Sequence, residues 1–330
     1  MLALIRNHTY SCGFFFILAL FNLEHCSYSQ YSIIQGFKTY CIKRVEIDST
    51  TDIQNQIILW RSLEKRIITR LDYYLLSTSY ASIGNVDSSA KYLSLAADLG
   101  LRFSSKDDTS FLLTYPWKLL RSNFTGWNSL KEHIDRNTRE YPSKKNCVSD
   151  NLELYKSLLY GSGDKDQFLR SHRKKTIDSL GLVDLDSLWK TQITNDEKNQ
   201  KTLMRIVEDV GWPSSECFSK DERNNAWLIA QHADNDIEFQ IYCFHKIIIK
   251  WSFSEVLPSQ VAYLFDRILL NIGDKQLFGT QFVFRKKEGQ LDPKPLNYDF
   301  KITNKLRKLF GLPSIESYLA ESLNHIKVTK

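Results

Sequence analysis

Apolar residues recur at steps of three and four along several long stretches of the chain, a spacing typical of amphipathic α-helices. The clearest stretch is 224–251, where one apolar stripe predicts a single continuous helix. Its core-facing positions are Ala230, Ala233, Ile237, Ile241, Phe244, Ile248 and Trp251. Similar spacing predicts further helices over 52–82, 88–98, 259–272, 298–310 and 314–325. The pattern therefore indicates a mainly α-helical protein.

One segment near the C-terminus has the alternating pattern of a strand instead. It runs over residues 276–284 and is rich in Phe, Thr and Val. Residues 287–290 would turn the chain back towards Leu291, so we expect a small β-hairpin. Gly279 lies inside the predicted strand, which indicates a bulge or a close approach of the backbone.

Residues 52–99 are predicted to form two antiparallel helices joined by a turn at Gly84 and Asn85. Small side chains at Ser77, Ala90 and Ala97 would let the two helices approach closely. The hairpin resembles a tetratricopeptide unit, which implies a peptide-binding repeat. Such arrays need about three units to bury their faces, so an ordinary α-hairpin is an equally good interpretation.

Length and composition predict a globular protein with two domains. The 330 residues are 42% hydrophobic and 13% aromatic, well above the composition of a disordered chain. A polar, turn-like stretch at 143–146 is the expected boundary. It would separate a helical, tetratricopeptide-like region (30–143) from a helical domain with a β-hairpin (146–330).

The N-terminus has the pattern of a secretory signal peptide. Arg6 precedes an apolar run at 13–23 that is too short to cross a bilayer, and small residues follow at 27–29. We expect cleavage after Ser29 and export of the mature chain, with an uncleaved anchor or a core helix as the alternatives. No later stretch approaches the length of a membrane span.

Charge and cysteine spacing disfavour several classes of protein. The net charge of +6 is modest, and we interpret the basic runs at 170–175 and 285–287 as solvated surface, with no nucleic-acid partner. Cysteines remaining after cleavage would be Cys41, Cys147, Cys217 and Cys243, without a CxxC pair. Zinc ribbons are therefore disfavoured, and the cysteines form one or two disulfides or are buried thiols.

Familiar catalytic motifs are also missing. The sequence contains no Walker loop, dinucleotide GxGxxG, GxSxG elbow or HExxH helix. It therefore identifies no cofactor and disfavours nucleotide-dependent enzymes and the common serine and zinc hydrolases.

The predicted helix over 224–251 carries a polar row beside its apolar stripe. His232, Asp236 and Gln240 recur at steps of four, so one continuous helix would place them in line at the edge of a cleft. His232 could act as a general base oriented by a carboxylate. The first two could also bind a metal, but no third ligand follows from the spacing. The alternative is a solvated row with an ordinary ion pair.

Asp266 lies between Tyr263 and Leu270 on the next predicted helix, so its carboxylate should be partly desolvated and need a partner. Arg267 is adjacent in sequence and must point elsewhere. Two separate structural salt bridges are the alternative. The candidate catalytic residues are His232, Asp236 and Asp266, and the candidate ligand-binding residues are Gln231, Gln240, Arg267, Gln276, Thr280 and Gln281.

Five short motifs surround these candidates: GWP at 211–213, QHAD at 231–234, FQ at 239–240, AYLFDR at 262–267 and QLFGTQ at 276–281. Their order and spacing resemble a bacterial family known only as a domain of unknown function, over residues 146–325. Phe278 stands where that family usually has Tyr. The resemblance implies no particular reaction, but it favours a functional polar row over a solvated one.

We therefore expect an exported bacterial protein, periplasmic or extracellular, with a His/Asp/Gln/Arg cleft in its C-terminal domain. That cleft would bind a small polar ligand and could hydrolyse it. The alternative is a non-catalytic interaction module, in which the helical hairpin binds a protein or peptide and the polar motifs are structural.

Overall fold

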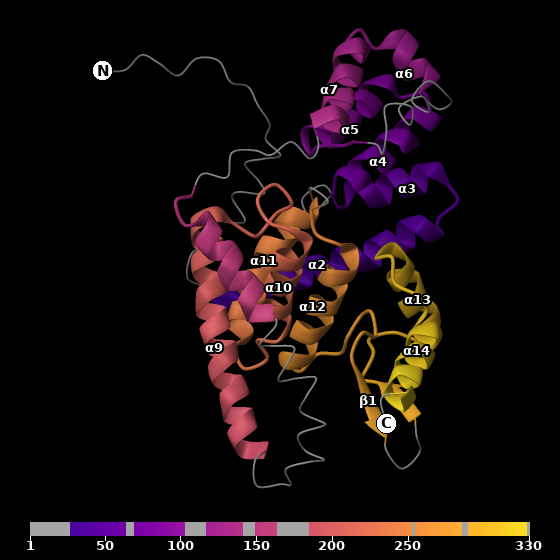
Figure 1. Cartoon of the computed structure of the whole chain (residues 1–330). Helices are drawn as coiled ribbons and strands as arrows, with labels where there is room; N and C mark the ends of the chain where they lie inside the picture. Colours follow the sequence, from indigo (N-terminus) through magenta and orange to yellow (C-terminus); the bar gives the residue numbers. More distant parts are fainter. Residues whose placement is uncertain are drawn as a thin grey trace.

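The computed structural model describes residues 27–63, 69–102, 117–140, 149–163, 185–252, 255–285 and 290–328. Over these residues the protein is mainly helical, with one small antiparallel β-hairpin near the C-terminus (Figure 1). The predicted fold class is therefore confirmed. Among the described helices, none is long and apolar enough to cross a membrane.

The N-terminal half consists of helices. They are α2 (Ser27–Ser49), α3 (Ile53–Arg61), α4 (Arg70–Ser82), α5 (Val86–Asp98), α6 (Lys118–Asn123) and α7 (Trp127–Glu140). Residues 152–163 are helical as well. The prediction of one helix over 52–82 is wrong. Asp52 caps the start of α3, and Thr69 starts α4 with a capping box, so each helix begins at its own N-cap.

The predicted hairpin of α4 and α5 is confirmed. Gly84 has a positive φ of 74° at the turn, and Asn85 caps α5. Ser77, Ala90 and Ala97 are buried, as expected for close helix packing. The contact is close enough for the Ser77 hydroxyl to donate to the Ser89 carbonyl oxygen at 2.7 Å. The likeness of this hairpin to a tetratricopeptide unit stays a prediction.

The C-terminal half contains the β-hairpin and the longest described helix. Its elements are α9 (Leu185–Val210), α10 (Lys220–Gln231), α11 (Ile237–Ser252), α12 (Pro258–Asn271), β1 (Phe282–Arg285), β2 (Gln290–Pro293), α13 (Phe300–Leu309) and α14 (Ile315–Val328). The strands are antiparallel, with Phe282 opposite Pro293 and Arg285 opposite Gln290.

The predicted continuous helix over 224–251 is wrong, because the chain turns between α10 and α11. His232 ends α10 as its C-cap, and its amide still donates to the Leu228 carbonyl oxygen. Asp236 starts α11 by accepting a hydrogen bond from the Phe239 amide at 2.9 Å. Short Asp and Asn side chains compete with helical hydrogen bonds in this way and favour turns and N-caps. The apolar stripe continues across the turn because both helices bury one face.

Helix α2 packs inside the C-terminal core although it comes from the N-terminal end of the chain (Figure 1). The ring of Phe37 lies 4.7 Å from that of Phe265 and 5.2 Å from that of Phe244. An ion pair of 2.7 Å joins Lys38 to Asp274. Cleavage after Ser29 would leave all these contacts in the mature chain.

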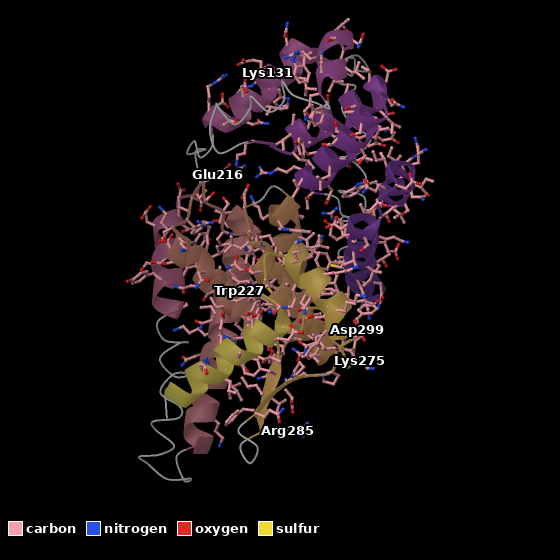
Figure 2. All side chains as sticks on the ribbon, turned by 90° about the vertical axis from the view of Figure 1, so that its right-hand side faces the viewer. Lys131, Glu216, Trp227, Lys275, Arg285 and Asp299 are labelled. Atoms are coloured by element: carbon pink, nitrogen blue, oxygen red, sulfur yellow. The ribbon has the colours of Figure 1, made fainter. Side chains whose placement is uncertain are left out.

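A second, smaller core lies among α4, α5, α6 and α7. Leu93, Trp117, Leu120 and Ile134 are its most deeply buried large residues. Lys131 on α7 and Arg285 on β1 lie at opposite ends of the molecule (Figure 2). The predicted boundary at 143–146 falls outside the described residues, and the helix α2 shows that the C-terminal core also uses residues from before it.

Candidate functional site

Two adjacent residues of α12, Asp266 and Arg267, organise most of the candidate polar side chains. Neighbouring residues in a helix differ by about 100° in direction, so the two side chains reach different surroundings. Asp266 is fully buried, whereas the side chain of Arg267 is 23% exposed.

The Asp266 carboxylate holds residues 276–281, which we call the Asp266 loop. One carboxylate oxygen accepts hydrogen bonds from the amides of Leu277 and Phe278, at 2.7 and 3.0 Å. The other accepts from the amide and the hydroxyl of Thr280, at 2.9 and 3.0 Å. The predicted strand over 276–284 is therefore wrong in its first part, because these amides bond to a side chain rather than to a neighbouring strand.

Burial raises the pKa of Asp266 to about 6, although hydrogen bonds from Phe278, Thr280 and Leu277 lower it. All four contacts favour the ionised form, but desolvation of the fully buried carboxylate is the larger effect. Asp266 therefore combines strong hydrogen bonding with an unusually high proton affinity.

The carbonyl oxygens of the Asp266 loop are held from the other side by α13 and α14. Arg307 is fully buried and donates to the carbonyl oxygens of Phe278 at 2.6 Å and Gly279 at 3.2 Å. The hydroxyl of Tyr318 donates to the Thr280 carbonyl oxygen at 3.0 Å. Sequence reasoning missed both residues. Arg307 lies on the apolar face of its helix, which could have predicted that it is buried. The sequence does not indicate which carbonyl oxygens it binds.

Gln276 closes the Asp266 loop on itself. Its side-chain amide donates to the carbonyl oxygens of Gln281 and Lys294, and its oxygen accepts from the Gln281 amide at 3.0 Å. Gly279 has a φ of 64°, and a Cβ there would lie 2.5 Å from the Cδ1 atom of Ile315. The side chains of Gln276 and Thr280, predicted as ligand-binding residues, thus hold the loop: Gln276 bonds across it and to Lys294, and Thr280 bonds to Asp266.

Arg267 is the centre of a second group, which we call the Arg267 cluster: Gln231, Asp234, Gln240, Arg267, Asn271 and Gln281. The Arg267 guanidinium donates to the Gln231 carbonyl oxygen at 2.8 Å, to the Asp234 carboxylate at 3.2 Å and to the Gln281 side-chain oxygen at 3.3 Å. Asp234 was not among the candidates, although it lies in the QHAD motif. The turn between α10 and α11 brings it here.

The remaining members connect α11 to α12. The side-chain amide of Asn271 donates to the Gln240 side-chain oxygen at 2.9 Å and to the Asp234 carboxylate at 3.3 Å. Gln240 is fully buried and donates to the Gln231 carbonyl oxygen at 3.4 Å. The side-chain oxygen of Gln231 is buried without a hydrogen-bond partner. Asn271 was also missed, although it lies one helical turn after Arg267.

His232 and Asp236 lie at the two ends of the α10–α11 turn and do not form a row with Gln240 on one helix. Asp236 is exposed and caps α11, and His232 is partly exposed at the end of α10. The structure therefore joins Gln231, Gln240, Arg267 and Gln281 in one cluster. It places Asp266, Gln276 and Thr280 together in the neighbouring buried loop.

Two further observations bear on chemistry. Within the part of the chain that the structure describes, no group of three or more His, Cys, Asp or Glu side chains is arranged to hold a metal ion. Cys217 is disulfide-bonded, whereas Cys41 and Cys243 are free and buried.

Comparison with known protein families gives a match in the C-terminal half of the chain. The model of a family described as being of unknown function, DUF6624, matches residues 164–328, which is half of the chain. The match contains the whole Asp266 loop and the whole Arg267 cluster. Comparisons with curated proteins and with solved structures found no match.

Proposed function

The chain belongs to the family of unknown function DUF6624, and we propose that its family domain binds a small polar ligand at the Arg267 cluster. The observation that carries the proposal is the state of Arg267. Its guanidinium donates hydrogen bonds to Gln231, Asp234 and Gln281, and the side chain still remains 23% exposed. A fixed, accessible guanidinium is well suited to donate a hydrogen bond to a ligand oxygen, because little side-chain freedom is lost on binding.

The lengths of the hydrogen bonds support the same proposal. Several contacts in the cluster measure 3.2 to 3.5 Å, beyond the usual optimum near 2.9 Å. Long contacts are weak, so a ligand can replace them at a small cost. The side-chain oxygen of Gln231 is a buried acceptor without a partner, so a hydrogen bond from a ligand donor to this oxygen would be favourable.

The chemistry of the cluster defines the ligand class. Arg267 offers hydrogen-bond donors, and Asp234, whose side chain is 50% exposed, offers an acceptor with negative charge. The ligand should therefore carry a hydrogen-bond acceptor and a donor close together, as amides, amino acids and sugars do. Binding is favoured over hydrolysis, because Asp266 is enclosed by the loop and Asp236 caps a helix.

A thermal-unfolding screen of the full chain against free amino acids, dipeptides and monosaccharides tests the proposal. A ligand at a hundred times its Kd stabilises the folded protein by about 2.7 kcal/mol. We expect a compound that stabilises the wild type and an Arg285→Lys control, but not Arg267→Lys or Asp234→Asn. Arg285 is a suitable control because it is an exposed arginine paired with Asp292 at the hairpin. A compound that stabilises Arg267→Lys as strongly as the wild type would contradict the site.

We also propose that the protein is bacterial and is exported. The signal-like N-terminus motivates the proposal, and the disulfide of Cys217 supports it, since disulfides persist in oxidising compartments. The mature chain should begin at Gln30. Mass spectrometry of the native protein checks this, and an intact Met1 on the cytoplasmic protein would contradict it.

A second candidate function is protein binding by the α4–α5 hairpin. Exposed apolar side chains favour it: Ile83 is 39% and Leu119 is 48% exposed, and both lie beside Gly84 at the turn. If the hairpin binds a partner, Ile83→Asp combined with Leu119→Asp should abolish co-purification of that partner and leave unfolding unchanged. Retention of the partner by the double variant would exclude the hairpin turn as the binding surface.

A further inference from the structure

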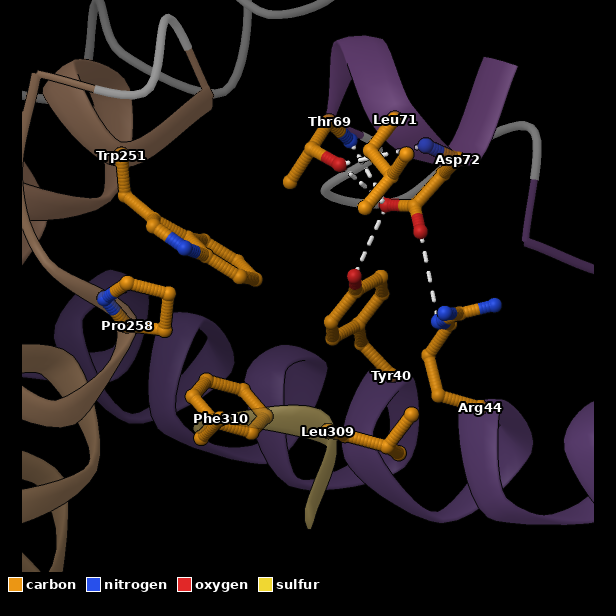
Figure 3. A pocket seen from close by; sticks show the side chains of 9 residues that line it. All are labelled: Tyr40, Arg44, Thr69, Leu71, Asp72, Trp251, Pro258, Leu309 and Phe310. Atoms are coloured by element: carbon orange, nitrogen blue, oxygen red, sulfur yellow. Dashed lines mark hydrogen bonds and ion pairs between the residues drawn. The ribbon is translucent and has the colours of Figure 1, made fainter. Parts of the chain in front are cut away.

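A cavity of about 120 Å³ lies where α2, the start of α4, the end of α11, the start of α12 and the end of α13 meet (Figure 3). It is separate from the Arg267 cluster and includes residues outside the family match. Leu71 lines it and is 54% exposed, so the cavity reaches the surface there. An apolar cavity of roughly 150 Å³ in another protein is large enough to bind benzene. This cavity is somewhat smaller but open at Leu71, so a single small ring is the largest group that it can hold.

One wall of the cavity is aromatic. Trp251 and Phe310 stack with their ring centroids 5.4 Å apart, and Tyr40 meets Trp251 edge to face at 5.8 Å. All three rings are at least nine-tenths buried, and Pro258 lies beside them (Figure 3). Flat apolar surfaces of this kind favour a ring that can stack or meet them edge-on.

The opposite wall is polar and almost fully paired. The buried carboxylate of Asp72 accepts hydrogen bonds from the Tyr40 hydroxyl at 2.8 Å and from the Thr69 amide and hydroxyl. Its other oxygen lies 3.2 Å from the Nε atom of Arg44 (Figure 3). These contacts fix the polar wall before any ligand arrives.

Arg44 is the exception to this full pairing. Its side chain is 8% exposed and is stacked 4.6 Å over the Trp60 ring. Its Nη1 atom is buried without a hydrogen-bond partner, and its ion pair with the half-exposed Asp48 carboxylate is long, at 3.6 Å. A buried guanidinium nitrogen without an acceptor is unfavourable, so the site lacks one acceptor oxygen.

We infer that this cavity binds a small neutral molecule with one ring and one acceptor oxygen, such as an aromatic alcohol. The ring would contact Trp251 and Phe310, and the oxygen would accept from Arg44. A neutral oxygen fits better than a carboxylate, because Asp72 and Asp48 already balance the charge of Arg44. This inference is independent of the ligand proposed for the Arg267 cluster.

Three one-ring probes test the inference on the full chain: benzyl alcohol, toluene and benzoate. The protein has 7 tryptophans, so the shift of the Trp251 indole resonance can be followed by NMR and assigned with Trp251→Phe. Benzyl alcohol should bind about tenfold more tightly than toluene, because only the alcohol pairs with a charged donor. Benzoate should bind more weakly than benzyl alcohol.

Two variants locate the binding. Arg44→Lys keeps the charge beside Asp72 but removes Nη1, so the preference for benzyl alcohol over toluene should disappear while toluene still binds. Leu71→Trp fills the opening from an exposed position, where the fold tolerates change, and should weaken both probes. The inference is wrong if the Trp251 resonance responds to no probe. That result would mean that only water accepts a hydrogen bond from the Nη1 atom of Arg44. It is also wrong if the alcohol has no advantage in the wild type or if Leu71→Trp leaves binding unchanged.

Discussion

The Asp266 loop and the Arg267 cluster are organised by adjacent residues of one helix, yet these two residues differ in burial and in the lengths of most of their hydrogen bonds. The carboxylate of Asp266 is fully buried and has four contacts of 2.7 to 3.0 Å. Arg267 is partly exposed, and its contacts with Asp234 and Gln281 measure 3.2 and 3.3 Å.

The comparison shows that a polar motif does not by itself identify a functional site. The QLFGTQ motif fits the requirements of a loop whose inner amides bond to side chains, while its two ends bond to the backbone of residues 294–297. The QHAD motif instead turns the chain and presents Asp234 beside Arg267. Stability should therefore depend mainly on the first motif, and ligand binding on the second.

The largest expected effect is that of Asp266→Ala. The change leaves three buried amides and the Thr280 hydroxyl without an acceptor, so we expect a loss of about 3 to 5 kcal/mol in the free energy of unfolding. Urea unfolding measures it. A loss below about 1 kcal/mol would show that the loop does not depend on this carboxylate.

The second expected effect concerns pH. Because the pKa of Asp266 is raised to about 6 in the folded protein, the folded state binds a proton more readily than the unfolded state. Protonated Asp266 therefore adds stability at low pH that is lost as the pH rises through about 6, an effect of about 3 kcal/mol.

Urea unfolding from about pH 4 to 7 checks this effect against Asp266→Asn, which does not titrate. The wild type should gain stability relative to the variant as the pH falls. A constant difference between the two proteins across this range would mean that the pKa of Asp266 is not raised.

A smaller effect is expected from Gly279→Ala. The new Cβ would take up a positive φ and would lie 2.5 Å from Ile315, so we expect a loss of about 1 to 3 kcal/mol. Ile315→Val removes the Cδ1 atom that would clash. In that background Gly279→Ala should cost less, and an equal cost in both backgrounds would leave the backbone conformation as the sole cause.

The smallest effect on stability should come from Arg267→Lys. Its ion pair with Asp234 is partly exposed, and such pairs contribute roughly 0 to 1 kcal/mol. Lysine keeps the charge but loses the geometry of the guanidinium, so ligand binding should be lost while unfolding changes little. A large loss of stability would show that Arg267 mainly stabilises the fold and would contradict its assignment to a binding site.

Much of the fold follows from local patterns. The spacing of apolar residues predicts the α4–α5 hairpin, and the turn at Gly84 follows from the residue itself. The different directions of Asp266 and Arg267 follow from helix geometry alone. These features depend on interactions between residues that are close together in the sequence, so the sequence alone is enough to predict them.

The features that could not be predicted depend on contacts over long distances in the chain. Arg307 reaches the Asp266 loop from another helix, and Phe37 packs against Phe265 across more than half of the sequence. The break at 232–236 was hidden because the apolar stripe continues through it. That break is what separates His232 and Asp236 from Gln240 and brings Asp234 to Arg267.

The central claim is that Asp266 and Arg267, one residue apart, belong to a structural site and a binding site respectively. Urea unfolding of the matched pair Asp266→Ala and Arg267→Ala tests it most directly. We expect the first variant to lose at least about 3 kcal/mol and the second no more than about 1.5 kcal/mol. Equal losses, or a larger loss for Arg267→Ala, would contradict the claim.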